Sequence, residues 1–250
     1  MGVWKRGTKA FLVLLLATLA IGVVAANVEA STFTLNNVFS RNTPSGASPW
    51  ATAVFTDTGT NQVTLTLTGS LGASGQFITE WDFNVNSTFI TSSLSGSMSS
   101  CTTCTSVPVS ISSDAFKADG DGLHDIPLQF KPSDGSSTHF DGSDVAVIVF
   151  TCTGCSGFNA NVFNSLSDSG VPADPAGPFH TAAHVQGIPG TGDQTCSGWI
   201  SDTVAGSSGS SDGTCGSTPI PEPMTMFLGG TGLLALGYAG RKRLFSRFAS

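Results

Sequence analysis

Apolar and polar residues alternate with a period of two along residues 32–35, 63–68 and 77–85. These stretches are rich in Thr, Val, Ile and Phe, and such alternation is typical of β-strands with one buried and one solvated face. Stretches of similar character lie at residues 51–57, 107–112, 125–130, 145–151, 158–163 and 180–187. Turn residues separate them, and no helical period is sustained between residues 31 and 222. The pattern predicts an all-β domain at residues 31–200, an antiparallel β-sandwich that is jelly-roll-like or immunoglobulin-like.

The first departure from this alternation is at the N-terminus. Three basic residues among the first nine precede an uncharged, mostly apolar stretch at residues 10–26. A basic start followed by an apolar segment and small residues is typical of a secretory signal peptide, which we assign to residues 1–30. We expect signal peptidase to cut after Ala30, with Ala26 as the alternative, and a signal anchor that is never cut is the other interpretation.

The second departure is at the C-terminus. Residues 224–240 carry no charge, and as a helix they would span about 25 Å, just enough to cross a ~30 Å hydrocarbon core. Arg241, Lys242 and Arg243 follow, and the positive-inside rule places such a cluster in the cytoplasm and the preceding domain on the far side. Residues 201–217 are rich in Gly, Ser and Asp and predict a flexible stalk.

A short motif stands just before this predicted transmembrane helix. Pro221, Glu222 and Pro223, followed by the apolar stretch and the basic end, resemble the PEP-CTERM sorting signal of Gram-negative bacteria, here over residues 218–250. The resemblance implies recognition by an exosortase, a membrane cysteine transpeptidase, and removal of the anchor near Glu222. It also implies an inner-membrane precursor that is later displayed at the cell surface or in an exopolysaccharide matrix. An ordinary anchor that is never cut is the alternative.

The region between the two targeting segments is also similar to a recurrent, uncharacterised type of PEP-CTERM ectodomain. The residues that carry this likeness are 51–57, 63–68, 76–84, 116–125, 183–187 and 197–200. That type brings no assigned activity, so it implies a structural or binding role only because no enzymatic one is attached to it.

The charge of the exported region differs from that of the whole chain. Residues 31–222 contain three basic residues against 16 acidic ones, a net charge of −13, whereas the full chain carries −7. Such an acidic surface repels phosphates and anionic lipids, so nucleic acid is excluded as a partner. Divalent cations and neutral glycans remain compatible with it, and so does simple solubility.

Six cysteines lie in the exported region: Cys101, Cys104, Cys152, Cys155, Cys196 and Cys215. An even number outside the cytoplasm predicts three disulfides. Two Cys-x-x-Cys pairs would also suit a four-thiolate zinc site in a reducing compartment. We expect Cys101–Cys104 and Cys152–Cys155 as local pairs, and Cys196–Cys215 tying the stalk to the domain.

One loop is a candidate calcium site. Asp119, Asp121 and Asp125 alternate with glycines within residues 117–125, and carboxylates in such a turn can direct several oxygens at one hard cation. Lys117 stands where a calcium loop would need its first ligand, and no flanking helices are predicted. An acidic turn between two strands is the alternative interpretation.

Other candidate chemistry is sparse. His180 and His184 could share one face and ligate a metal, although no third ligand is evident and a packing role is the alternative. Glu80 and Asp82 flank Trp81 and would share a strand face, as the carboxylates of a glycosidase could. The sequence therefore predicts no enzyme but an exported structural protein of the polysaccharide or biofilm matrix. A glycan- or calcium-binding module is the alternative, and a glycan-active enzyme a more distant one.

Overall fold

The structure, a computed structural model, describes residues 28–203 except 73–74, 92, 106, 120–121, 131–138, 169–176 and 191–194. The predicted sorting signal, with Pro221, Glu222, Pro223, Arg241, Lys242 and Arg243, lies outside these residues, as do residues 1–27. Within the described part of the chain, no helix has the length and apolar character needed to cross a membrane.

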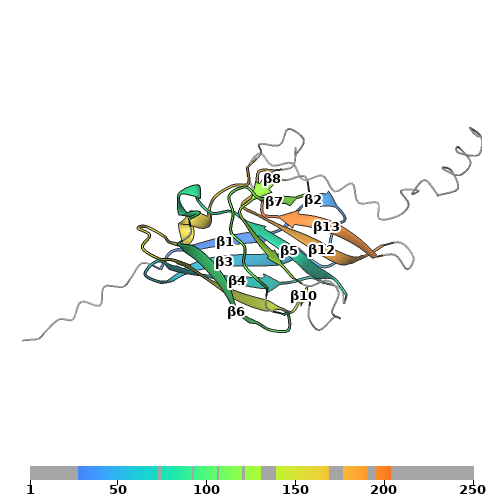
Figure 1. Cartoon of the computed structure of the whole chain (residues 1–250). Helices are drawn as coiled ribbons and strands as arrows, with labels where there is room; N and C mark the ends of the chain where they lie inside the picture. Colours follow the sequence, from blue (N-terminus) through green and yellow to red (C-terminus); the bar gives the residue numbers. More distant parts are fainter. Residues whose placement is uncertain are drawn as a thin grey trace, which may run out of the picture.

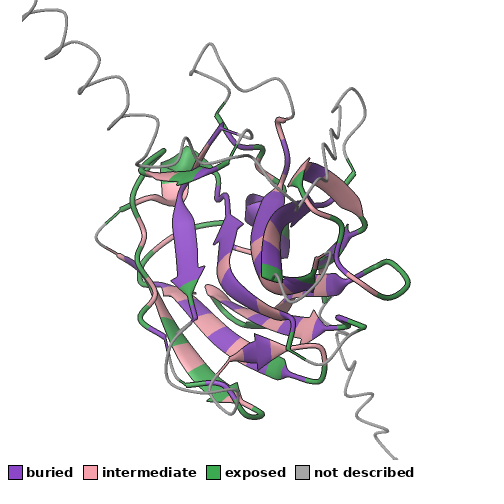
Figure 2. Cartoon of the chain, turned by 90° about the vertical axis from the view of Figure 1, so that its right-hand side faces the viewer, coloured by how far each residue is buried: buried purple, intermediate pink, exposed green. Residues whose placement is uncertain are grey.

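The described chain is all-β, and every pair of neighbouring strands is antiparallel. The five-stranded sheet has the order β1 (Ala30–Leu35), β3 (Ala51–Gly59), β4 (Gln62–Gly69), β11 (Val145–Cys152) and β6 (Leu94–Cys101). Buried residues alternate with more exposed ones along β1, β4 and β11, which confirms the period-two interpretation of these segments. Figure 2 shows this alternation as coloured bands along the strands.

The six-stranded sheet has the order β10 (Phe140–Asp141), β5 (Phe77–Phe83), β12 (Thr181–Pro189), β13 (Thr195–Ser201) and β2 (Asn37–Arg41). Its sixth strand is β9 (Ile126–Gln129). Both β9 and β10 pair with the same edge of β5, β10 at residues 77–78 and β9 at residues 80–83. Figure 1 shows the two sheets as separate layers, with β5, β12 and β13 grouped apart from β1, β3 and β4.

One hydrophobic core is shared by the two sheets. Phe55 of β3 meets the ring of Phe83 of β5 edge-on at 5.5 Å between centroids, and it stacks on Phe163 at 4.1 Å. All three rings are buried, with exposed fractions of 1% or less. Aromatic pairs in these geometries add to the stabilisation that burial of their area gives, so this cluster holds the sheets together.

A short hairpin covers part of the opposite face of the six-stranded sheet. It consists of β7 (Phe116–Ala118) and β8 (Gly122–His124), which pair with each other, and Leu123 of β8 also forms an isolated bridge with Asp168. Ala118 at its end belongs to a second, smaller buried cluster with Phe39, Phe179, Ala182 and Trp199. The six-stranded sheet is therefore packed on both faces where the hairpin lies.

Two segments that alternation predicts as strands are not strands. Residues 158–163 contain a 3-10 turn instead, Ala160–Phe163, because the side chain of Asn159 accepts a hydrogen bond from the Asn161 amide and caps it. Residues 107–112 form only an isolated bridge between Val109 and Leu128.

The domain also reaches slightly beyond both predicted boundaries. Ala30, the residue expected before the signal-peptidase cut, already pairs with Thr56 in β1. Glu29 accepts a hydrogen bond from the Asp57 amide through its carbonyl and another from Asn161 through its carboxylate. At the other end Ser201, where the predicted stalk begins, is the last residue of β13 and is fully buried.

Candidate functional site

A row of mostly polar side chains crosses the six-stranded sheet on the face that is turned away from the shared core. Direct pairing across β9, β5, β12, β13 and β2 places in one line Gln129, Glu80, His184, Trp199 and Ser40. Residues that pair directly share one face of a sheet. The next residues along their strands, Trp81, Ala183 and Ile200, belong to the shared core, so the row faces outward. We call it the His184 row.

His184 is the central residue of this row. Its Nδ1 lies 3.0 Å from the Thr79 hydroxyl, which also donates to the His184 carbonyl at 3.4 Å. The imidazole stacks on Trp199 with ring centroids 4.8 Å apart. Burial, helped by the positive charge of Arg41, lowers the pKa of His184, so the ring is neutral at pH 7.

Glu80 lies directly opposite His184, with the two Cβ atoms about 4.5–5.5 Å apart in such a pair. Burial raises the pKa of the Glu80 carboxyl, and a hydrogen bond with Gln129 and the nearby His124 act in the other direction. The row thus combines an imidazole that resists protonation with a carboxyl that resists ionisation. Both shifts favour the uncharged forms of these groups.

Asp82, the other predicted glycosidase carboxylate, pairs with Ala182 two residues further along β5 and is on the same face as Glu80. Its side chain is completely buried, with an exposed fraction of 0%, whereas Glu80 is partly exposed. The two carboxyl groups therefore do not present an open pair to a polysaccharide.

Asp119 and Asp125, two of the three predicted calcium ligands, serve different parts of the structure. The Asp119 carboxylate accepts from Ser40 Oγ and Arg41 Nε, both at 3.1 Å, and so ties the hairpin turn to β2. The Asp125 carboxylate accepts from the backbone amides of Val85 at 3.0 Å and Asp114 at 2.9 Å. Burial raises the pKa of Asp125, and these two amide bonds oppose that shift.

The two aspartates lie beyond opposite ends of the β7–β8 ladder, which runs from the Ala118–Gly122 pair to the Phe116–His124 pair. At ~3.3 Å per residue this separates their backbones by roughly 13 Å along the hairpin, whereas the oxygen ligands of one calcium ion lie within about 2.6 Å of it. A shared calcium ion does not fit this arrangement. Asp121 lies outside the described residues, and within these no group of three metal-ligating side chains is found.

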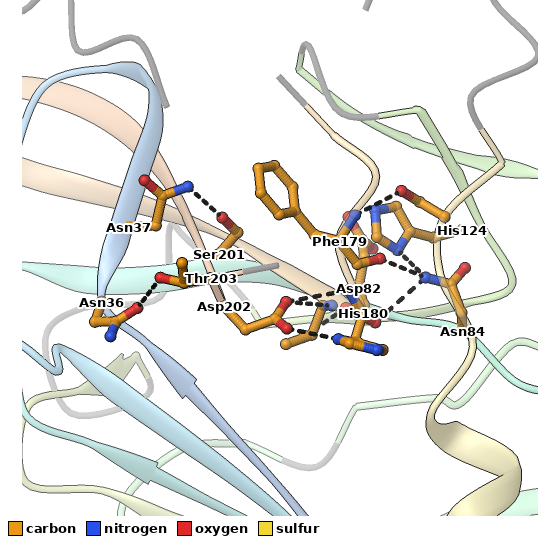
Figure 3. A network of polar contacts seen from close by, with 12 residues as sticks. Asn36, Asn37, Asp82, Asn84, His124, Phe179, His180, Ser201, Asp202 and Thr203 are labelled. Atoms are coloured by element: carbon orange, nitrogen blue, oxygen red, sulfur yellow. Dashed lines mark hydrogen bonds and ion pairs between the residues drawn. The ribbon is translucent and has the colours of Figure 1, made fainter. Parts of the chain in front are cut away.

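His180, the other predicted metal-ligand histidine, takes part in a network at the end of β12 (Figure 3). Its Nδ1 lies 2.7 Å from Oδ2 of Asp202, and its ring stacks on Phe33. Oδ1 of Asp202 accepts from the backbone amides of His180 at 3.0 Å and Thr181 at 3.2 Å. His180 and His184 therefore have separate partners, and Asp202 fastens the end of β13 to the start of β12.

The same network continues to the β7–β8 hairpin. Asn84 donates through Nδ2 to the carbonyl of His180 at 3.2 Å and lies 3.0 Å from Nδ1 of His124. Both Asn84 and His124 are buried. The hairpin is thus held to the sheet by buried polar contacts as well as by its apolar cluster.

The cysteine pairs Cys101–Cys104 and Cys152–Cys155 are disulfides in the structure. These are the two local pairs that the Cys-x-x-Cys spacing predicts. Cys196 is disulfide-bonded as well, and Cys215, the remaining cysteine, lies outside the described residues. The thiolates of the two pairs are therefore not available as a zinc site.

Comparisons with protein families, with curated proteins and with solved structures find no match for this chain. The candidate site accordingly rests on its own geometry. Glu80 and His184 are both visible in the sequence, but their position in one row depends on the pairing of β5 with β12, more than 100 residues apart.

Proposed function

We propose that this chain is exported by the general secretory route and sorted by an exosortase to the cell surface or the extracellular polysaccharide matrix of a Gram-negative bacterium. There it acts as a structural, non-enzymatic component. Before processing, the apolar stretch at residues 224–240 anchors the precursor in the inner membrane. The observation that carries the proposal is the pair of local disulfides, Cys101–Cys104 and Cys152–Cys155, because such bonds form and persist in oxidising compartments.

The order of the strands favours a jelly-roll-like sandwich over an immunoglobulin-like one. The described chain changes sheet between β1 and β2, β2 and β3, β4 and β5, β5 and β6, β10 and β11, and β11 and β12, and it passes from β6 to β9 by way of the β7–β8 hairpin. In the immunoglobulin fold consecutive strands stay within one sheet as pairs, A with B, D with E and F with G. Repeated crossing is typical of the jelly roll.

Replacing Pro221, Glu222 and Pro223 together with Ala tests the sorting step. We expect the variant to accumulate at full length in the inner membrane, whereas the wild-type product loses its C-terminal helix. Pro219→Ala is the matched control, because it removes a proline beside the motif and should be processed normally. Cell fractionation followed by mass spectrometry of the intact product reports both cuts. A wild-type chain found in the cytosol with both ends intact would contradict the proposal.

A second candidate function is a glycan-binding module, and the His184 row favours it. The row offers the imidazole of His184, the Glu80 carboxyl and the exposed amide of Gln129 on one face. Binding of the purified chain to a glycan array, compared between wild type and His184→Ala, tests it. Gln62→Ala, on the five-stranded sheet, is the control. If the wild type retains no glycan, the glycan-binding function is rejected and the structural role is the remaining candidate.

A calcium-binding module stays a prediction that now depends on Asp119 and Asp121. Calorimetry of the purified chain with calcium chloride measures it directly. If calcium produces no heat of binding and does not raise the melting temperature, the chain is not a calcium-binding module.

A further inference from the structure

A polar hollow of about 260 Å³ lies beyond the end of β5, where four stretches that are far apart in the sequence meet. The lining comes from residues 85–87 after β5, Ser113 and Asp114 before β7, Asp125, and Ser165 and Leu166 after the 3-10 turn at Ala160–Phe163. We call it the Asn86 pocket. None of its lining residues belongs to the His184 row, so it is separate from the site described above.

Hydrogen bonds between these stretches hold the walls of the pocket in place. The Asp125 carboxylate ties the first two stretches together through the two backbone amides described above. The amide of Asn86 donates to the carbonyl of Val162 at 2.8 Å, and the hydroxyl of Ser165 donates to the same carbonyl at 3.2 Å. The pocket is therefore formed before a ligand enters, which lowers the entropic cost of binding.

Asn86 presents a hydrogen-bond donor at this pocket. Its side-chain Oδ1 accepts from the amide of Thr88 at 3.1 Å and from the Thr88 hydroxyl at 2.7 Å. A backbone N–H can only donate, so this contact fixes which end of the side-chain amide is oxygen. Asn86 is exposed, so its NH₂ end is left for a ligand.

Asp114 presents an acceptor. It is exposed and has a φ of 48°, in the left-handed region that Asp adopts more readily than most residues. The hydrogen bond from its amide to Asp125 holds it in that conformation. Its Oδ2 accepts from the Ser113 hydroxyl at 3.1 Å, and a carboxylate has about four acceptor positions, so Oδ1 can take a further donor. A fixed donor and a fixed acceptor in one hollow suit a ligand that both accepts and donates.

An apolar side chain adjoins these polar groups. Leu166 has an exposed fraction of 44%. Among the described residues it is one of three large hydrophobic side chains that are exposed, with Val28 and Val145. Leu166 therefore adds a surface for C–H groups to a hollow that is otherwise mostly polar.

These features narrow the class of ligand. The described lining includes no cationic side chain, and its two carboxylates repel anions. A divalent cation needs several oxygen ligands, but both oxygens of Asp125 already accept from amides, and Leu166 offers no ligand atom. A sugar ring combines hydroxyls, which accept and donate, with an apolar face of C–H groups. At ~30 Å³ per molecule the hollow has room for roughly nine waters, which suits one such ring.

We propose that the Asn86 pocket binds one ring of a neutral sugar through two neighbouring hydroxyls. One hydroxyl accepts from Asn86 Nδ2, the other donates to Asp114 Oδ1, and the C–H face of the ring packs on Leu166. The proposal deepens the second candidate function and rests on its premise that the domain meets glycans. It does not depend on the sorting step or on the His184 row.

Nuclear magnetic resonance of the purified chain tests it, with D-glucose, D-galactose, D-mannose and N-acetyl-D-glucosamine as probes at millimolar concentrations. The side-chain NH₂ signals of Asn86 and the methyl signals of Leu166 are followed. We expect at least one sugar to shift both sets of signals along a saturable curve, and calcium chloride, added alone, to leave them unchanged. If none of the four sugars shifts these signals, or if calcium chloride shifts them, the proposal is wrong.

The first variant removes the donor. Asn86→Asp keeps an oxygen for the Thr88 amide and replaces the NH₂ group with a second oxygen, so binding should weaken about tenfold or more. Asn159→Asp is the matched control, because Asn159 caps the other 3-10 turn in the same way and does not line the pocket. Unchanged affinity in Asn86→Asp would overturn the proposal.

Two further variants act at the other contacts. Asp114→Gly removes the carboxylate and keeps the amide bond to Asp125 in a conformation that glycine adopts without strain, so it should also weaken binding about tenfold or more. Leu166→Ala changes an exposed side chain and should weaken binding several-fold while the melting temperature stays the same. Wild-type affinity in Asp114→Gly would overturn the proposal even if Asn86→Asp does not fold.

A glycan array in which His184→Ala abolishes binding, while the Asn86 and Leu166 signals do not respond, would reject the pocket but keep the second candidate function. An array on which the wild type retains no glycan, together with no response of these signals, would reject both.

Discussion

Replacing Asp202 with Ala should lower the free energy of unfolding by about 2–5 kcal/mol. The substitution removes the acceptor of two backbone amides, those of His180 and Thr181, and the 2.7 Å contact with the His180 ring. Thr181 is fully buried, so water cannot replace its lost partner, and an unsatisfied buried donor costs about 1–3 kcal/mol. The loss is large beside the ~5–15 kcal/mol that stabilises a typical domain.

Asp202→Asn is the informative companion. Its Oδ1 can still accept from both backbone amides, and its amide nitrogen can face His180 Nδ1 in the tautomer that accepts. We expect a loss of about 1 kcal/mol or less, in the range of a single net hydrogen bond. Thr203→Ala removes only an exposed hydrogen bond to Asn36 and should stay within about 0.5 kcal/mol of the wild type.

Equilibrium unfolding in urea, followed by tryptophan fluorescence under non-reducing conditions, measures all three variants. Trp81 and Trp199 are both buried, so their emission reports the unfolding of the six-stranded sheet. Equal losses for the Ala and Asn variants would refute the reasoning, because they would show that the backbone amides are not what Asp202 satisfies. An Ala variant as stable as the wild type would refute it as well.

The other predictions concern titration and export. In an NMR titration His184 should have a midpoint below the ordinary value of about 6.5. Arg41→Gln should move that midpoint upward, because it removes a positive charge that disfavours the imidazolium, and a downward move would contradict this explanation. Because the pKa of Glu80 is raised in the folded state, its ionisation costs stability as the pH rises through that pKa. The melting temperature of Glu80→Gln, relative to that of the wild type, should therefore be higher at neutral pH than in acid. A difference in melting temperature that instead grows on acidification would contradict this prediction. N-terminal sequencing of the exported product should start at Asn27, not Ser31, because a cut after Ala30 would remove Ala30, which pairs with Thr56 in β1, and Glu29, which accepts from the Asp57 amide.

The strands with regular alternation could be predicted from the sequence, and those without it could not. In β4 every second residue is apolar and buried, and period and burial agree. In β6, Leu94–Cys101, serine and glycine predominate, and the segment is a strand because it pairs with β11. Residues 158–163 show the opposite error, since local capping by Asn159 outweighs their alternation.

The candidate site, too, could be predicted from the sequence only in part. Glu80 and His184 are residues of chemical interest in any reading of the sequence, but which of them lie side by side depends on strand order and register. The roles of Asp202 and Asp125 leave no local signal, because their partners are backbone amides brought near by the fold. A carboxylate or amide used in this way looks like any other surface residue in the sequence.

The position of β13 bears on how the domain would respond to mechanical load. It is the last strand before the stretch that leads to the C-terminus, and it lies between β12 and β2 rather than at an edge. Tension applied through Thr203 would therefore meet two ladders of hydrogen bonds at once, together with the carboxylate of Asp202 next to the point of entry. A domain exposed to flow or shear is well served by an exit strand that cannot be peeled away from one side.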